Sequence, residues 1–368
     1  MKIYKRLRIL CLTDYECCYL SHSLLVGLHE TGHEIYELPM LKSIRGGVDE
    51  GYILADGNRG YSATPGYLTP NPIPTYQREE LTPDLVRSMD LIVMLSGRNY
   101  ARQAHATITN MLGHKPEAIV CIEGEDYEWI DRNLLNDINP RVFFKRELSK
   151  DYSLAAYCGA LGRPIYPLPF AAFTRSYPEL DDTIKDRDFY LSLGDTHQLR
   201  RDLVKSLLEA QDEIRQFREL TTRVCCNSED PEIKGRAHPL SPWKEYIEQQ
   251  AHARVTAVIR GYGSDTLHCW EAFSFATLVI YYEPKIYIPY PFKDGVHCLT
   301  LEEGQHDKAV PLIRRYVKEL KNTGQHIANQ GKAHCREYHG TKARAEYLID
   351  ISMRVLGGER VEYEEFGL

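Results

Sequence analysis

The N-terminal half of the chain alternates short apolar runs with stretches of helical periodicity. Residues 6–12 form a run typical of a buried strand, and the helix-like segment that follows ends near Gly32, where a left-handed C-cap is expected. Four further apolar runs follow: 90–95, 118–124, 141–148 and the proline-rich, extended 164–173. Strands that alternate with helices predict a parallel sheet covered by helices.

The same alternation starts again after the polar stretch 177–188. Its predicted strands are 189–195, 221–226, 254–260 and 276–283, and residues 307–356 are mostly helical. Two such runs predict an α/β protein with two Rossmann-like, doubly wound parallel-sheet domains that face each other across a cleft. We place the domains at residues 1–180 and 181–368.

Residues 41–78 break this pattern. They are rich in glycine, proline and tyrosine and show neither strand nor helix periodicity. Loops of this length in compact domains are usually functional or disordered. The segment is interpreted as a flap or an insertion. The pattern does not favour a segment that contacts a ligand over one that does not.

The charge and residue composition of the chain make some classes of function and location less plausible than others. The net charge of -7 argues against nucleic acid as a partner, because phosphate binding requires a basic surface. The 25 tyrosines exceed the 10 phenylalanines, and tyrosine suits both half-buried surfaces and sites that stack on polar ligands. Ten cysteines without a C-x-x-C motif indicate reduced thiols and a cytoplasmic protein. No apolar run reaches the roughly 18 residues of a transmembrane segment.

The turn from Arg260 to Thr266 carries the clearest local signal. It follows a predicted strand and opens a helix, as phosphate-binding turns do. Gly263 lets backbone approach a ligand, and Ser264, Asp265 and Thr266 are N-cap residue types, of which Asp265 is expected to cap the helix. Glu271, farther along that helix, would reach a sugar hydroxyl. The alternative is an ordinary strand–turn–helix with an ion-paired glutamate.

A second candidate lies after the first strand of the second half. Gly194 is followed by Arg200 and Arg201, a pair that can clamp a diphosphate. Two exposed helix arginines explain the pattern equally well.

Acidic residues and a histidine are candidates for a general base. Glu125 lies in a dense acidic turn, which is favoured as a solvated turn paired with Lys145 and Arg146. Asp14 and His22 near the first turn are a further candidate base and partner. Three His-Cys dipeptides lack zinc-finger spacing, so no metal site is expected.

Several short motifs resemble one family. Those in the second half are Gly263–Thr266, Trp270–Ala272, Leu278–Ile280, Ile327–Gly331, Tyr338–Thr341 and Ala343–Ala345. Those in the first half are Gly27–Glu34, Phe143–Glu147 and Pro167–Phe170. Together they resemble GT-B glycosyltransferases of the family 1/4-like type, and within them the CgeB-like branch.

The resemblance implies a hexosyl- or pentosyltransferase that uses a nucleotide-diphosphate sugar, such as a UDP-sugar, without metal or other cofactor. Glu271 would bind the ribose, and the Gly263–Thr266 turn with Arg200 or Arg201 would meet the diphosphate. An acceptor of unknown type would bind the first domain near Asp14 and His22.

One departure from the family leaves the stereochemistry open. Many retaining members carry two glutamates that are eight residues apart. Glu271 matches the later one, and this chain has Gly263 at the position of the earlier one. An inverting reaction would need a base, for which Asp14, His22 and Glu125 are the candidates. Two other hypotheses remain: a non-catalytic sugar-binding protein, and an NAD-linked oxidoreductase, indicated by a partial G-x-G-x-x-G turn with Glu283 as ribose acid.

Overall fold

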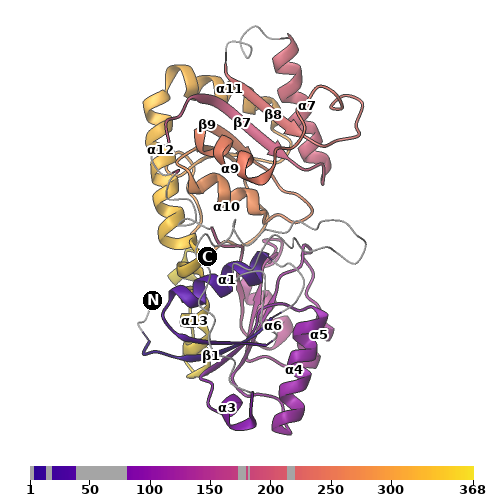
Figure 1. Ribbon diagram of the computed structural model, residues 1–368, viewed down its shortest axis with the longest axis vertical. Helices are drawn as coiled ribbons and strands as arrows, with labels where there is room; N and C mark the ends of the chain where they lie inside the picture. The colour runs from indigo at the N-terminus through magenta and orange to yellow at the C-terminus, as the bar shows by residue number, and fades with distance from the viewer. Residues whose placement is uncertain (1–3, 14–18, 39–80, 173–179, 181–182, 214–219) are drawn as a thin grey trace. The chain divides into compact units, whose positions relative to one another are not determined.

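The computed structural model describes residues 4–13, 19–38, 81–172, 180, 183–213 and 220–368 (Figure 1). The predicted loop at 41–78 lies outside these ranges. The chain divides into two compact units. The first comprises Met1–Ser176, Ile286–Pro291 and Gly340–Leu368, and the second Tyr177–Lys285 and Phe292–His339.

The first unit is built on a six-stranded parallel sheet. In spatial order its strands are β2 (Glu34–Leu38), β1 (Arg8–Leu12), β3 (Leu91–Met94), β4 (Ile119–Glu123), β5 (Val142–Lys145) and β6 (Ile165–Pro167). Its helices are α1 (Tyr19–Glu30), α3 (Pro83–Arg87), α4 (Asn99–Leu112), α5 (Arg132–Ile138), α6 (Leu154–Leu161), α13 (Thr341–Leu356) and the short η6 (Tyr363–Phe366).

Successive residues of these strands pack on opposite faces of the sheet, because strand side chains alternate. Phe143 packs in the same hydrophobic core as residues of α4, α5 and α6. Its neighbour Phe144 packs instead against Tyr166 and against Tyr347 of α13. Helices on both faces explain why the inner strands read as continuous apolar runs.

The second unit repeats this plan with a five-stranded parallel sheet. The spatial order is β11 (Leu299–Leu301), β10 (Leu278–Tyr282), β9 (Ala253–Val258), β7 (Arg187–Leu193) and β8 (Thr222–Cys226). Its α-helices are α7 (Gln198–Glu213), α9 (Trp243–His252), α10 (Leu267–Ser274), α11 (Ala309–Arg314) and α12 (Lys321–His334). Short η3 (His306–Lys308), η4 (Arg315–Glu319) and η5 (Cys335–His339) complete it.

Alternation along β7 again separates two cores. Phe189, Leu191 and Leu193 pack with residues of α7, α11 and α12. Tyr190 packs with Tyr246 and Ile247 of α9. Each unit is therefore a doubly wound sheet, as the alternating pattern predicted.

The C-terminal helix corrects the predicted domain boundary. The sequence placed all of 181–368 in the second domain, whereas residues 286–291 and 340–368 belong to the first unit. Helix α13 packs along α1, where a Cβ atom on Gly27 would lie 2.0 Å from the backbone oxygen of Thr341. Thr341 Oγ1 also donates to Glu30 Oε2 at 2.5 Å. Two motifs from opposite ends of the chain thus form one helix–helix contact.

Most predicted strands are confirmed within two or three residues, and Gly32 adopts the expected positive φ of 76°. The three-residue strand β11 was missed, because so short a run carries no readable periodicity. No helix within the described ranges has the length and apolar character needed to cross a membrane.

The α1–α13 contact predicts opposite effects for two glycine substitutions. Gly27→Ala should lower the free energy of unfolding by about 1–3 kcal/mol, because the two helices must separate. Gly159 lies in α6 with nothing within 4 Å of a Cβ position, so Gly159→Ala should raise it by about 0.5–1 kcal/mol. Urea denaturation measures both, and a neutral Gly27→Ala would show that the contact adapts.

Candidate functional site

The turn between β9 and α10 brings polar groups to the carboxyl edge of the second sheet, where parallel α/β sheets bind ligands. The amide of Gly261 donates to the carbonyl of Gly263 at 3.0 Å and closes the turn. A Cβ atom on Gly261 would lie 2.9 Å from Arg200 Nη2, so a side chain there would displace the guanidinium. The turn and Arg200 are therefore packed as one unit.

Arg200 connects the ends of two strands. Its Nε donates to the carbonyl of Arg260 at 2.9 Å, Nη1 to Gly194 at 3.2 Å and Nη2 to Ile259 at 3.4 Å. The residue is 8% exposed. A guanidinium committed to three carbonyls holds the ends of β7 and β9 together, in addition to placing a positive charge beside the turn.

Arg201 has a different environment. Its Nη1 forms an ion pair with Asp195 Oδ1 at 2.7 Å, and Nε and Nη2 donate to Gln198 Oε1. Asp195 Oδ2 also accepts a hydrogen bond from Ser228 at 2.5 Å. The side chain of Arg201 is half-buried, so the two arginines are neither a matched pair nor two exposed helix residues.

The prediction that Asp265 caps α10 is wrong. Thr266 occupies the N-cap position and makes no side-chain capping hydrogen bond. Asp265, predicted to cap the helix, accepts a 2.7 Å hydrogen bond from the indole N–H of Trp270. Both residues are buried, and a buried indole N–H requires an acceptor. This buried hydrogen bond between Asp265 and Trp270 therefore holds the turn against α10.

Glu271 is held by a residue that the sequence did not suggest. The hydroxyl of Tyr246, on α9, donates to Glu271 Oε2 at 2.7 Å. The other carboxyl oxygen, Oε1, is buried and has no hydrogen-bond partner within the described residues. Burial raises the pKa of Glu271 to about 7, although the hydrogen bond from Tyr246 opposes the shift.

His268, the second residue of α10, lies one turn before Glu271. It is 9% exposed, its ring centroid lies 6.3 Å from that of Tyr246, and neither ring nitrogen has a hydrogen-bond partner in the described part of the chain. Burial, with a smaller contribution from Arg200, lowers its pKa to about 3. The sequence signal that marks this residue is its i, i+3 spacing to Glu271; it belongs to one of the three His-Cys dipeptides.

The opposite end of α10 is fixed by a half-buried lysine. Lys185 Nζ donates to the carbonyls of Ala251 and Phe275, each at 2.6 Å, and to Thr277 Oγ1 at 3.1 Å. These oxygens lie at the C-terminal ends of α9 and α10, where a cation is favourable. Lys185 therefore helps to hold Tyr246 and Glu271 in register.

The first-unit candidates are only partly described. Asp14 lies outside the described residues. His22 is in α1 and is 1% exposed, and burial lowers its pKa to about 4. It is therefore neutral at physiological pH.

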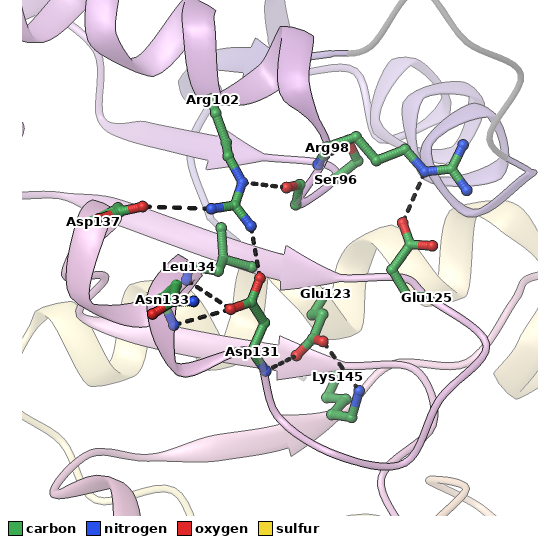
Figure 2. Close-up of polar contacts among 11 residues, drawn as sticks. Ser96, Arg98, Arg102, Glu123, Glu125, Asp131, Asn133, Leu134, Asp137 and Lys145 are labelled. Carbon is green, nitrogen blue, oxygen red and sulfur yellow. Dashed lines mark hydrogen bonds and ion pairs between the residues drawn. The ribbon is translucent and has the colours of Figure 1, made fainter.

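The acidic turn after β4 is paired with basic side chains (Figure 2). Glu125 Oε1 lies 2.8 Å from Arg98 Nε, and Asp126 pairs with Arg146. Glu123 Oε1 lies 3.4 Å from Lys145 Nζ, and both side chains are buried. Burial raises the pKa of Glu123 and lowers that of Lys145, and the attraction within the pair opposes both shifts. The paired interpretation agrees with this geometry, although the Glu123–Lys145 pair is not solvated.

A second network supports this turn. Arg102 of α4 donates to the carbonyl of Gly97 at 2.6 Å and pairs with Asp131 at 2.7 Å (Figure 2). Asp131 caps α5 by accepting from the amides of Asn133 and Leu134. Its own amide reaches Glu123 Oε2 at 3.4 Å. The carboxyl ends of β3 and β4 are thus joined to α4 and α5 by polar contacts.

Within the described ranges, no three His, Cys, Asp or Glu side chains form a group that could hold a metal ion. Glu283, the candidate ribose acid of a dinucleotide site, is exposed after β10.

No protein-family profile matches the sequence, and no curated protein sequence matches it either. Solved structures do match. Anabaena Alr3699/HepE in complex with UDP-glucose has a TM-score of 0.57 at 11% identity, covering 94% of this chain and 99% of that chain. A UDP-forming α,α-trehalose-phosphate synthase from Burkholderia vietnamiensis has a TM-score of 0.59 at 11% identity, covering 96% and 100%.

A third similar structure is Staphylococcus aureus TarM in complex with UDP, with a TM-score of 0.51 at 12% identity, covering 71% of this chain and 55% of that chain. The chain has the GT-B fold. At these identities the likeness establishes the fold and leaves the reaction to be argued from the site.

The two arginines predict unequal losses of stability. Arg200→Met should lower the free energy of unfolding by at least about 2 kcal/mol, because three buried carbonyls lose charged donors. Arg201→Met should cost about 1 kcal/mol or less, because its ion pair is half-exposed. Urea denaturation of the two variants tests the difference, and equal losses would contradict the bracing role of Arg200.

Proposed function

We propose that the chain is a glycosyltransferase that moves a hexosyl or pentosyl group from a nucleoside-diphosphate sugar to an acceptor. The observation that carries this proposal is the Glu271 carboxylate in a GT-B fold. One of its oxygens is held by Tyr246, and the other is buried without a partner in the described structure. A hydroxyl-bearing ligand would complete the hydrogen bonding that the described residues leave unmade.

The second unit would hold the donor. Glu271 would accept hydrogen bonds from the ribose hydroxyls, and the backbone from Gly263 to Thr266 would meet the diphosphate at the start of α10. Thr266 Oγ1 supports this placement, since it is buried and neither caps the helix nor has another described partner. Arg200, Arg201 and Arg260 would supply positive charge beside the diphosphate.

The diphosphate would be bound without a metal ion. Helix N-terminal amides and guanidinium groups can balance the charge of the leaving nucleoside diphosphate. Arg200 and Arg260 would make this turn locally basic on a chain whose net charge is -7, whereas the charge of Arg201 is partly balanced by its ion pair with Asp195.

The first unit would hold the acceptor and, in an inverting reaction, the base. Among the proposed bases, Glu125 is half-buried and lies at a strand end, whereas His22 is almost fully buried. Asp14 remains a candidate by sequence alone. Gly263 supplies no carboxylate at the position where many retaining relatives carry one, so both stereochemical outcomes remain within the proposal.

UDP-glucose is the first donor to test, since the Anabaena neighbour was solved in complex with it. The CgeB-like branch is part of the proposal on the short sequence motifs alone, two of which, Gly27–Glu34 and Ala343–Ala345, include residues of α1 and α13.

The proposal predicts selective stabilisation by nucleotide sugars. UDP and UDP-glucose should raise the melting temperature in a concentration-dependent manner, and NAD should not. Slow release of UDP from UDP-glucose would show that the protein is more than a binder. Stabilisation by NAD alone would contradict the proposal and favour an oxidoreductase.

Glu271→Gln should weaken UDP binding and change its pH dependence. With a pKa of about 7, wild-type Glu271 is mostly protonated at pH 6 and ionised at pH 8. Only the ionised form accepts from both ribose hydroxyls, so wild-type affinity should rise about tenfold over this range. Titration calorimetry should show a smaller rise in Glu271→Gln, which retains only the titration of UDP itself.

The same pKa predicts an effect on the ligand-free protein. The raised pKa means that the folded state holds this proton more tightly than the unfolded state. Wild type should therefore lose stability relative to Glu271→Gln as the pH rises from about 4.5 to 7. Parallel pH profiles for the two proteins would exclude a raised Glu271 pKa.

A further inference from the structure

His268 is a buried polar residue whose hydrogen bonds are not made within the described part of the chain. It is 9% exposed, and both Nδ1 and Nε2 lack a partner in the described part of the chain. A neutral imidazole carries one donor and one acceptor, and leaving them unpaired in a protein interior costs free energy. Buried polar groups are otherwise almost always paired, so His268 requires an explanation.

Two residues near His268 in the sequence also carry buried polar atoms without described partners. Glu271, one turn later on α10, also has an unpaired buried atom, Oε1, and Thr266, two residues earlier, has another, Oγ1. The N-cap residue and two residues of α10 thus carry four buried polar atoms that have no partner in the described structure. Tyr246 packs beside the imidazole, and Arg200 is near enough to lower the pKa of the ring.

The position of the imidazole selects the chemical class of its partner. It lies two residues after the N-cap of α10, where helix amides favour an anion, and the Arg200 guanidinium reinforces that preference. Glu271, farther along the helix, would repel an anion and suits hydroxyls instead. An anionic oxygen is therefore favoured at His268, and neutral hydroxyls are favoured at Glu271.

We propose that His268 is a donor-binding residue whose ring N–H donates a hydrogen bond to an oxygen of the nucleoside diphosphate. This inference rests on the proposed function and adds to it a residue that fixes the diphosphate between the turn and Glu271. Burial keeps the ring neutral at physiological pH, so it contributes a directional hydrogen bond and the arginines contribute the charge.

The deciding variant is His268→Phe. Phenylalanine keeps a ring against Tyr246 and removes both nitrogens. UDP affinity, measured by calorimetry, should fall roughly tenfold to a hundredfold, as expected for a hydrogen bond to a charged group. The melting temperature of the ligand-free variant should stay the same or rise, because two unpaired polar atoms leave the interior. A lower melting temperature with unchanged UDP affinity would show a structural histidine and overturn the proposal.

Two comparisons identify the group that His268 contacts. His268→Gln restores an N–H donor and should recover part of the UDP affinity lost in His268→Phe. Uridine lacks phosphate, so His268→Phe should bind uridine as wild type does. An equal loss of affinity for uridine and UDP would place His268 at the nucleoside and overturn the assignment to the diphosphate.

Glu271→Gln distinguishes failure of this inference from failure of the proposed function. If Glu271→Gln weakens binding of both uridine and UDP while His268→Phe binds UDP normally, only the inference about His268 is wrong. If wild type binds none of UDP, GDP, ADP and dTDP, the proposed function is wrong, and the inference with it.

Discussion

Burial of the inner strands on both faces is the constraint on which the rest of this structure depends. Helices cover both sides of each sheet, so residues along β3, β4, β5 and β10 are buried and almost all apolar. Polar chemistry is therefore excluded from most of the strand length and gathers where the strands end. The buried Glu123–Lys145 pair in the first unit and the Arg200 contacts in the second both lie at such strand ends.

The two sheet edges use their polar groups differently. In the first unit, the carboxylates of Glu123, Glu125 and Asp131 are paired with basic side chains. In the second, Arg200 and Asp265 are also committed to protein groups, but Glu271 and His268 keep buried atoms without described partners. In the first unit Glu123 Oε1 and Lys145 Nζ make no described hydrogen bond, but they balance each other's charge as an ion pair. Glu271 Oε1 and the two nitrogens of His268 have no described partner of either kind, which costs stability unless a ligand completes their hydrogen bonding. This contrast is why the second unit carries the donor proposal.

Support for the site comes from contacts within the protein that join the elements around it. Lys185 ties the ends of α9 and α10 together, Trp270 is bonded to Asp265, and Arg200 holds the ends of β7 and β9. The Lys185 and Arg200 contacts join elements that are far apart along the chain, whereas the Trp270–Asp265 contact joins α10 to the turn just before it. Such supports keep Glu271 and Tyr246 at hydrogen-bonding distance, as a preformed binding site requires.

The sequence alone determined the two doubly wound sheets, most strand positions and the turn before Glu271, because apolar periodicity and glycine placement are local properties. It also predicted that Arg200 and Asp265 would lie at that turn, although their contacts differ from those expected. Only the tertiary structure decided that α13 returns to the first unit, that Tyr246 holds Glu271 and that His268 has no partner among the described residues. Those outcomes depend on which distant segments pack together, and no local pattern encodes the partner across such a contact.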